Sequence, residues 1–482
     1  MNFGIVIRVL GILLLIEAVL MLPSLLIAIY TNGVDKIPFL IAILISVGLG
    51  FILSKKENYK NQISAKDGLA IVTLGWIIAS IIGAIPLYLS NSTTTYIDAF
   101  FEIVSGLTTT GATLISDVES LPDGIIFWRS FTHWIGGMGI LVFTVALLPA
   151  LGVGGFQIYK AESPGPVAGK IAPRIKDTAT ILYKTYAIIT ICQIIMLLLG
   201  KMNLFESLIY TFGTVGTGGF SDKNNSIAFY DSTYIQLVIG IFMVLSGVNF
   251  SHYYSLYNKK FKDVFYDGEL RLYLGIIFFS TIAITINLFT TSYTNIGLAL
   301  KDSFFQVSSL ITTTGFSTTD FDLWPSFSKG ILLLVMFIGG SAGSTAGGTK
   351  VIRTLVMFKL IKREITKIFH PRAVIALKDN NKIIDDDTVV NIFGYFSLYV
   401  FIFIASTLLV SLEGIDLLSA SSSVLTTLNN IGPGLGFVGP TRTFGEFHQL
   451  TKLLFSFLML LGRLELFTII ALLAPKNWRG EI

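Results

Sequence analysis

The sequence predicts an all-α integral membrane protein, in which two leading transmembrane helices precede four parallel helix–loop–helix repeats around a pseudo-fourfold axis. Three observations support this class. Hydrophobic residues make up 53% of the 482-residue chain and charged residues only 13%, which excludes an ordinary soluble globule. The charges are bunched between long apolar runs, as expected where a charge in lipid is costly. Four short polar runs that end in glycine recur along the chain.

Ten apolar runs are long enough to cross a bilayer core, which needs about 20 helical residues. They cover residues 5–30, 37–53, 69–89, 125–151, 178–199, 234–256, 272–291, 330–357, 389–411 and 450–473. The first run is too long for a signal peptide and contains Glu17, so we expect a retained helix.

The predicted chain has five parts. Residues 1–67 hold the two leading helices, and the repeats occupy 68–177, 178–271, 272–382 and 383–482. The single cysteine excludes an internal disulfide, and the four histidines show no paired ligand spacing. We therefore expect no cofactor and no catalytic metal site in this chain.

Lysine and arginine predict the orientation in the membrane. The connectors 54–67, 159–177, 257–271 and 359–382 hold 4, 4, 4 and 7 of these residues. The positive-inside rule places such connectors in the cytoplasm. We expect both termini to be cytoplasmic and the four glycine-closed loops to enter from the outer side.

The four glycine-closed runs align residue by residue when each is numbered backwards from its glycine. The glycines are Gly111, Gly219, Gly315 and Gly432. At position −13 stand Asp98, Glu206, Asp302 and Ser419; at −4 stand Leu107, Val215, Ile311 and Leu428. Gly218 is an alternative end of the second run, but only Gly219 keeps the acid in register. Two spans separate successive runs, so the repeats are parallel rather than inverted.

Each unit is predicted to form a short helix that stops midway through the membrane, followed by extended backbone. An acid near the helix start suits its positive end, and non-helical backbone at this depth needs protein or water around it. Four such strands would offer rings of main-chain oxygens to a cation. The oxygens are expected from Thr109, Thr110, Gly111, Thr217, Gly218, Gly219, Thr313, Thr314, Gly315, Asn430, Ile431 and Gly432. Close helix packing at small residues is the alternative for any single loop.

A glycine-rich run interrupts the eighth span, where each glycine costs about 1 kcal/mol against alanine in a helix. Its glycines are Gly339, Gly340, Gly343, Gly347 and Gly348. We expect a flexible gating loop beneath the four glycine-closed runs; a small-residue helix contact is the alternative. Arg463 lies inside the last span, where an unpaired guanidinium is expensive. We expect it to face a cavity, with a pair to Glu465 as the alternative, although residues two apart face different sides of a helix.

Two other function classes are weaker. A symporter that couples an ion to an organic solute needs convergent polar side chains at mid-membrane, and the sequence offers none beyond the four loops. A membrane enzyme needs a nucleophile and a base, and no such constellation is apparent.

The loop sequences Thr-Thr-Thr-Gly111-Ala-Thr, Gly-Gly219-Phe-Ser, Thr-Thr-Thr-Gly315-Phe-Ser and Leu-Asn-Asn-Ile-Gly432-Pro-Gly resemble those of the TrkH/TrkG potassium-uptake family. This family is related to KtrB and to plant HKT transporters, and the resemblance covers essentially the whole chain. It implies potassium translocation through a filter of four pore loops in the bacterial cytoplasmic (inner) membrane. The second loop, Thr-Val-Gly216-Thr-Gly-Gly219, is more glycine-rich than the form expected for this family.

The resemblance also implies further properties. These are a homodimer with one pore in each protomer, a cytoplasmic TrkA-type ring that binds nucleotides, and passage of K⁺, with Rb⁺ and more weakly Na⁺. The run from Gly339 resembles the family's intramembrane gating loop, and Arg463 resembles its pore-facing arginine. Passive flow and symport with H⁺ or Na⁺ both remain open.

Overall fold

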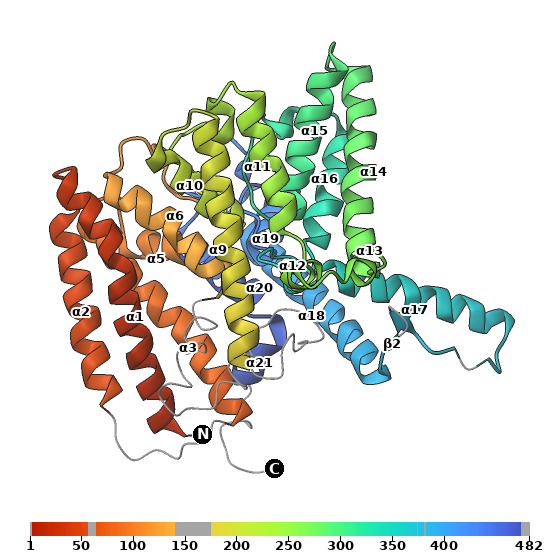
Figure 1. Cartoon of the computed structure of the whole chain (residues 1–482), viewed down its shortest axis with the longest axis horizontal. Coiled ribbons are helices and arrows are strands. Elements are labelled where there is room, and N and C mark those ends of the chain that lie inside the picture. Colours follow the sequence, from red (N-terminus) through yellow and green to blue (C-terminus); the bar gives the residue numbers. More distant parts are fainter. Residues whose placement is uncertain (1, 56–63, 140–174, 374, 380–381, 474–482) are drawn as a thin grey trace.

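The computed structural model describes residues 2–55, 64–139, 175–373, 375–379 and 382–473. This part of the chain is almost entirely helical, which confirms the predicted fold class (Figure 1). The leading helices α1 (Phe3–Tyr30) and α2 (Lys36–Ser54) form a hairpin at one edge of the molecule. Their apolar residues are numerous enough, with mean hydropathies of 2.7 and 2.5, to make both helices candidate membrane spans.

The first repeat consists of α3 (Ala65–Gly83), α4 (Ile85–Leu89), α5 (Tyr96–Leu107) and α6 (Asp123–Gly137). Helix α5 begins at a capping box, in which Thr95 and Asp98 satisfy each other's backbone amides. The expected fourth span continues to residue 151, and residues 140–151 lie outside the described ranges.

The second repeat consists of α9 (Ile175–Leu199), α10 (Leu204–Val215), the short η2 (Ser226–Phe229), α11 (Thr233–Ser246), α12 (Phe250–Tyr257) and α13 (Phe261–Phe265). The prediction of one continuous sixth span is wrong, because α11 and α12 meet at an angle of 90°. The side chain of Asn249 caps α12 by accepting from the amide of Ser251 at 2.9 Å. A new helix therefore starts there in a different direction.

The third repeat consists of α14 (Gly268–Thr291), α15 (Ile296–Ile311), η3 (Phe321–Leu323), α16 (Ser326–Ile338) and α17 (Val351–Phe369). The interruption predicted for the eighth span is present, since residues 339–350 are not helical. Helix α17 projects to one side of the molecule (Figure 1). After it, β1 (Lys378–Asp379) and β2 (Lys382–Ile383) pair as a minimal antiparallel ladder, a small addition to the all-α prediction.

The fourth repeat consists of α18 (Asp386–Ser411), α19 (Leu417–Leu428), η4 (Gly436–Val438), α20 (Gln449–Arg463) and α21 (Leu466–Leu473). The tenth span is also not continuous. Glu465 has a φ of 66°, in the left-handed region, and this residue separates α20 from α21. Within the described residues, six helices are long and apolar enough to cross a membrane, or seven if the bent α11–α12 pair is one span.

Burial differs between the middle of the molecule and its edges. A core of buried aromatic and aliphatic side chains joins the leading helices to the first and fourth repeats, and includes Trp76, Phe101, Trp128 and Phe455. The outer helix α14 instead exposes Phe278 at 59% and Phe279 at 71%. Large apolar side chains on an outer helix suit contact with lipid.

Candidate functional site

The four short helices α5, α10, α15 and α19 all end at position −4, as the repeat alignment predicts. After each, the amide at position −2 donates to the carbonyl at −5 at 3.1–3.4 Å, and the amide at −1 donates to the carbonyl at −6 at 2.8–2.9 Å. This pair of hydrogen bonds is the Schellman ending of a helix. It turns the amides back toward the helix. The carbonyls of residues 108–111, 216–219, 312–315 and 429–432 are therefore not needed as acceptors for the main-chain hydrogen bonds of the helix. We call these four stretches the glycine loops.

The backbone of the glycine loops repeats a strained conformation. At position −2, φ is 56° for Thr109, 57° for Thr217, 54° for Thr313 and 55° for Asn430. β-branched residues rarely adopt a left-handed φ, and such strain costs on the order of 1–3 kcal/mol per residue. The terminal glycines follow with φ of 76°, 79°, 85° and 93° for Gly111, Gly219, Gly315 and Gly432. Gly219, and not Gly218, shares this conformation with the other three.

The glycine loops form a closed ring. A Cβ added to each terminal glycine would lie less than 3.0 Å from a main-chain oxygen of the next loop. The pairs are Gly111 with Gly218, Gly219 with Thr314, Gly315 with Ile431, and Gly432 with Thr110. Contacts therefore run from the first loop to the second, third and fourth and back to the first. Four loops that meet in this order surround one axis, and a side chain at any of the glycines would collide with its neighbour.

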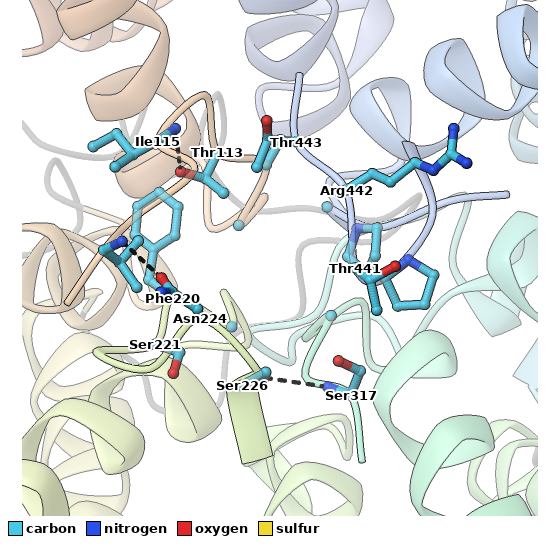
Figure 2. A pocket seen from close by; sticks show the side chains of 18 of the residues that line it. Thr113, Ile115, Phe220, Ser221, Asn224, Ser226, Ser317, Thr441, Arg442 and Thr443 are labelled. Carbon is cyan, nitrogen blue, oxygen red and sulfur yellow. Dashed lines mark hydrogen bonds between the residues drawn. The ribbon is translucent and has the colours of Figure 1, made fainter. Parts of the chain in front are cut away.

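A cavity of about 220 Å³ opens next to the ring. All four terminal glycines line it, together with residues that follow each loop, and we call it the vestibule. Figure 2 shows Thr113, Phe220, Ser317 and Thr441, one from each repeat, placed around it. At its rim, the side-chain amide of Asn224 donates to Asp117 at 3.0 Å and lowers the pKa of that carboxyl group.

The glycine-rich segment, residues 339–350, touches the glycine loops on the side where the short helices end. The amide of Gly347 donates to the hydroxyl of Thr313 at 2.6 Å, and the amide of Gly348 donates to the carbonyl of Asn429 at 3.0 Å. Gly339, Gly343 and Gly348 have φ between 68° and 78°. The segment thus reaches both the third and the fourth loop with its main chain; Gly340, the remaining glycine of the predicted gate, is packed against Ala346.

Glu269 joins the first half of the glycine-rich segment to the start of α17. Its Oε1 accepts from the amide of Ala342 at 2.7 Å and from the amide of Ile352 at 3.2 Å. The break between α11 and α12 holds the same first half, since the amide of Ser341 donates to the carbonyl of Gly247 at 3.0 Å. One buried carboxylate and one helix break therefore fix the path of the segment.

Arg463 lies between the segment and the ring. Its guanidinium donates to the carbonyl of Thr345 at 2.8 Å, to the hydroxyl of Thr109 at 3.3 Å, and to the carbonyls of Gly136 and Gly137 at 2.5 and 2.9 Å. Glu465, the sequence alternative as its partner, forms an ion pair with Arg353 of α17. Arg463 thus faces the middle of the molecule, beneath the first loop.

The acids at position −13 do not all have the expected place. Asp98 and Glu206 lie in the first turn of α5 and α10, near the positive end of the helix. The expectation is wrong for Asp302, because Asn295 caps α15 and the helix starts six residues before Asp302. Its carboxylate instead accepts from the hydroxyl of Tyr293 at 3.0 Å.

Two buried groups of α6 that the sequence did not single out support the loops. Arg129 pairs with Glu102 at 3.2 Å, and Glu102 accepts from the amide of Leu114, just beyond the first loop, at 2.5 Å. His133 contacts the second loop. Sequence spacing carried no signal for either, because their partners lie on other elements and are partly main-chain atoms.

A helical membrane protein whose four parallel loops close one ring of main-chain oxygens has the architecture of a cation transport protein. Comparison with known proteins gives the family: the chain belongs to the TrkH family of cation transport proteins, whose model matches residues 36–479. The Trk system potassium uptake protein TrkH of Escherichia coli (strain K12) is 39% identical over 99% of this chain and 100% of its own length. TrkG of the same organism is 36% identical over 98% and 97%.

A solved structure agrees with this assignment. The crystal structure of the potassium transporter TrkH from Vibrio parahaemolyticus superposes with a TM-score of 0.89 at 36% identity, covering 99% of this chain and 100% of that one. Likeness over the whole of both chains means that all four repeats are shared.

Proposed function

We propose that the chain takes up potassium across the bacterial cytoplasmic membrane through a selectivity filter made of the four glycine loops. The closed ring of contacts between each terminal glycine and the next loop's carbonyl is the observation that carries this proposal. Main-chain oxygens arranged around one axis can replace the hydration shell of a monovalent cation. The names of the relatives as potassium uptake proteins support the choice of ion.

The filter oxygens come from positions −2 to 0 of each loop. The chain has the five parts predicted from its sequence, which are the pair of leading helices and the four repeats. The filter oxygens belong to Thr109, Thr110, Gly111, Thr217, Gly218, Gly219, Thr313, Thr314, Gly315, Asn430, Ile431 and Gly432. Rb⁺ follows the same path and Na⁺ passes less well, because carbonyl rings suited to K⁺ coordinate the smaller ion less favourably.

The glycine-rich segment and Arg463 form the gate of this pathway. The segment donates main-chain hydrogen bonds to the third and fourth loops, and Arg463 places a positive charge beside the first. A neighbouring cation is repelled by that charge. Opening requires the segment to leave these contacts.

The protein works as a homodimer with a pore in each protomer, and a cytoplasmic TrkA-type ring moves the gate. Both termini face the cytoplasm. In support, α21 lies at the end of the molecule where α1 begins (Figure 1), and the basic connectors predict that end to be cytoplasmic.

Uptake of labelled rubidium into vesicles that contain the purified protein tests the proposal. With a membrane potential, negative inside, rubidium should accumulate, excess K⁺ should compete strongly and Na⁺ weakly. Equal competition by K⁺ and Na⁺ for rubidium uptake would refute it.

A further inference from the structure

The second glycine loop differs from the first and third in the side chains behind its main chain. Loops one and three have threonine at positions −3 and −1, and the two hydroxyls lie 2.8 Å apart in each (Thr108 with Thr110, Thr312 with Thr314). The second loop has Gly216 and Gly218 at these positions. The threonine pair that supports its neighbours is therefore missing.

His133 fills the space behind the second loop. Its side chain is fully buried, and a Cβ added to Gly218 would overlap the imidazole ring. A Cβ on Gly216 would lie less than 3.0 Å from the carbonyl of His133. Close approach of α6 thus explains why the second loop is rich in glycine.

Both ring nitrogens of His133 are engaged by main-chain atoms. Nδ1 lies 2.8 Å from the carbonyl of Gly106, which can only accept, so Nδ1 carries the hydrogen. Nε2 accepts from the amide of Phe220 at 3.1 Å. The ring is therefore neutral, and it ties helix α5 of the first repeat to the residue that follows the filter glycine Gly219.

Phe220 is held from two sides. The ring centroids of His133 and Phe220 are 4.3 Å apart, and the guanidinium of Arg129 lies 4.2 Å from the centroid of Phe220. Arg129 and His133 are one helical turn apart on α6, so both reach the same neighbour. The second loop is thus clamped at Gly218 and at Phe220.

We propose that His133 is a positioning residue that sets the ion selectivity of the second loop, where it replaces the threonine pair of loops one and three. It does not touch the ion. It acts by fixing the main chain from Gly218 to Phe220, so that the carbonyls keep the spacing suited to potassium. The inference rests on the proposed function of the glycine loops as a filter.

The test uses full-length protein in vesicles and compares potassium with sodium competition for rubidium uptake in wild type, H133A, G218A, the double variant and H133Q. H133A should lower the potassium-to-sodium ratio by roughly tenfold, the size expected when a buried amide loses its partner. G218A should lower it too, because its Cβ collides with the ring. The double variant should recover part of the loss of G218A, since the space is then free.

H133Q, whose amide can donate and accept, should lie between wild type and H133A. H370A, at an exposed position of the connector after α17, is the matched control and should equal wild type. Unchanged selectivity in H133A overturns the inference, as does a loss in G218A of equal size with and without the imidazole ring of His133. Should H133A fail to fold, unchanged selectivity in G218A overturns it instead. A wild-type protein without selective rubidium uptake refutes the filter itself.

Discussion

Arg463 donates a hydrogen bond to the main-chain oxygen of Thr345 at 2.8 Å, and this contact joins the end of α20 in the fourth repeat to the glycine-rich segment of the third. The same guanidinium reaches the hydroxyl of Thr109 in the first loop at 3.3 Å. One side chain therefore links three repeats beneath the ring. The position of the segment is coupled to the filter through it.

Replacing Arg463 by alanine should raise rubidium flux several-fold in the absence of any cytoplasmic partner. The change removes a hydrogen bond of a charged donor, a contribution of about 1.5–3 kcal/mol, and a positive charge beside the pathway. R463K keeps the charge but not the fork of donors, and should fall between R463A and wild type. Flux in R463A at or below the wild-type level would speak against a gating role.

Replacing Glu269 by alanine should loosen the first half of the glycine-rich segment and its connection to the start of α17. The amides of Ala342 and Ile352 lose their acceptor, at a cost of about 1–3 kcal/mol for each buried group. We expect a lower melting temperature in detergent and higher basal rubidium flux. E269Q keeps an oxygen acceptor and should remain close to wild type; wild-type stability and flux in E269A would show that Glu269 does not anchor the segment.

The ends of the four short helices could be predicted from the sequence because they are local. The apolar residue at −4 and the small polar residue at −2 define a helix ending whose hydrogen bonds all lie within six residues. The breaks at Asn249 and Glu465 were missed, since the flanking residues are apolar enough to continue a span. Main-chain groups next to the first break find their hydrogen-bond partners in distant parts of the chain. The carbonyl of Gly247, for example, accepts from the amide of Ser341.

The supporting groups behind the loops could not be predicted either. His133 lies 87 residues before its partner Phe220, and Lys452 lies 354 residues after Asp98. A single sequence shows periodicity and local spacing, but it does not show which side chains fill the space behind a loop. In the sequence, the only sign of the space that His133 occupies was the high glycine content of the second loop.

Replacing Gly315 by serine should lower the potassium-to-sodium ratio of rubidium competition by roughly tenfold, which corresponds to about 1.4 kcal/mol. The new Cβ collides with the carbonyl of Ile431, and φ of 85° is unfavourable for serine. G275S is the matched control, because a Cβ on Gly275 of α14 meets nothing within 4 Å. An unchanged ratio in G315S, with folding intact, would contradict the assignment of this loop.

Replacing Lys452 by methionine should destabilise the protein by about 3–5 kcal/mol, because it leaves the carboxylate of Asp98 buried without its cation. The two groups are 2.9 Å apart, and their side chains are 7% and 5% exposed. D98N together with K452M should recover part of the loss in melting temperature.

K367M serves as the comparison, since the pair of Lys367 with Glu364 is more exposed, at 40% and 54%, and exposed pairs contribute about 0–1 kcal/mol. If K452M and K367M lower the melting temperature equally, the buried pair does not hold the first and fourth repeats together.

Diffraction from crystals of the protein in rubidium, with data collected at the rubidium absorption edge, tests the central claim most directly. The account predicts anomalous peaks on the axis of the ring, each surrounded by main-chain oxygens of all four glycine loops. Peaks absent from that axis, or bound instead by side-chain carboxylates elsewhere in the protein, would contradict it.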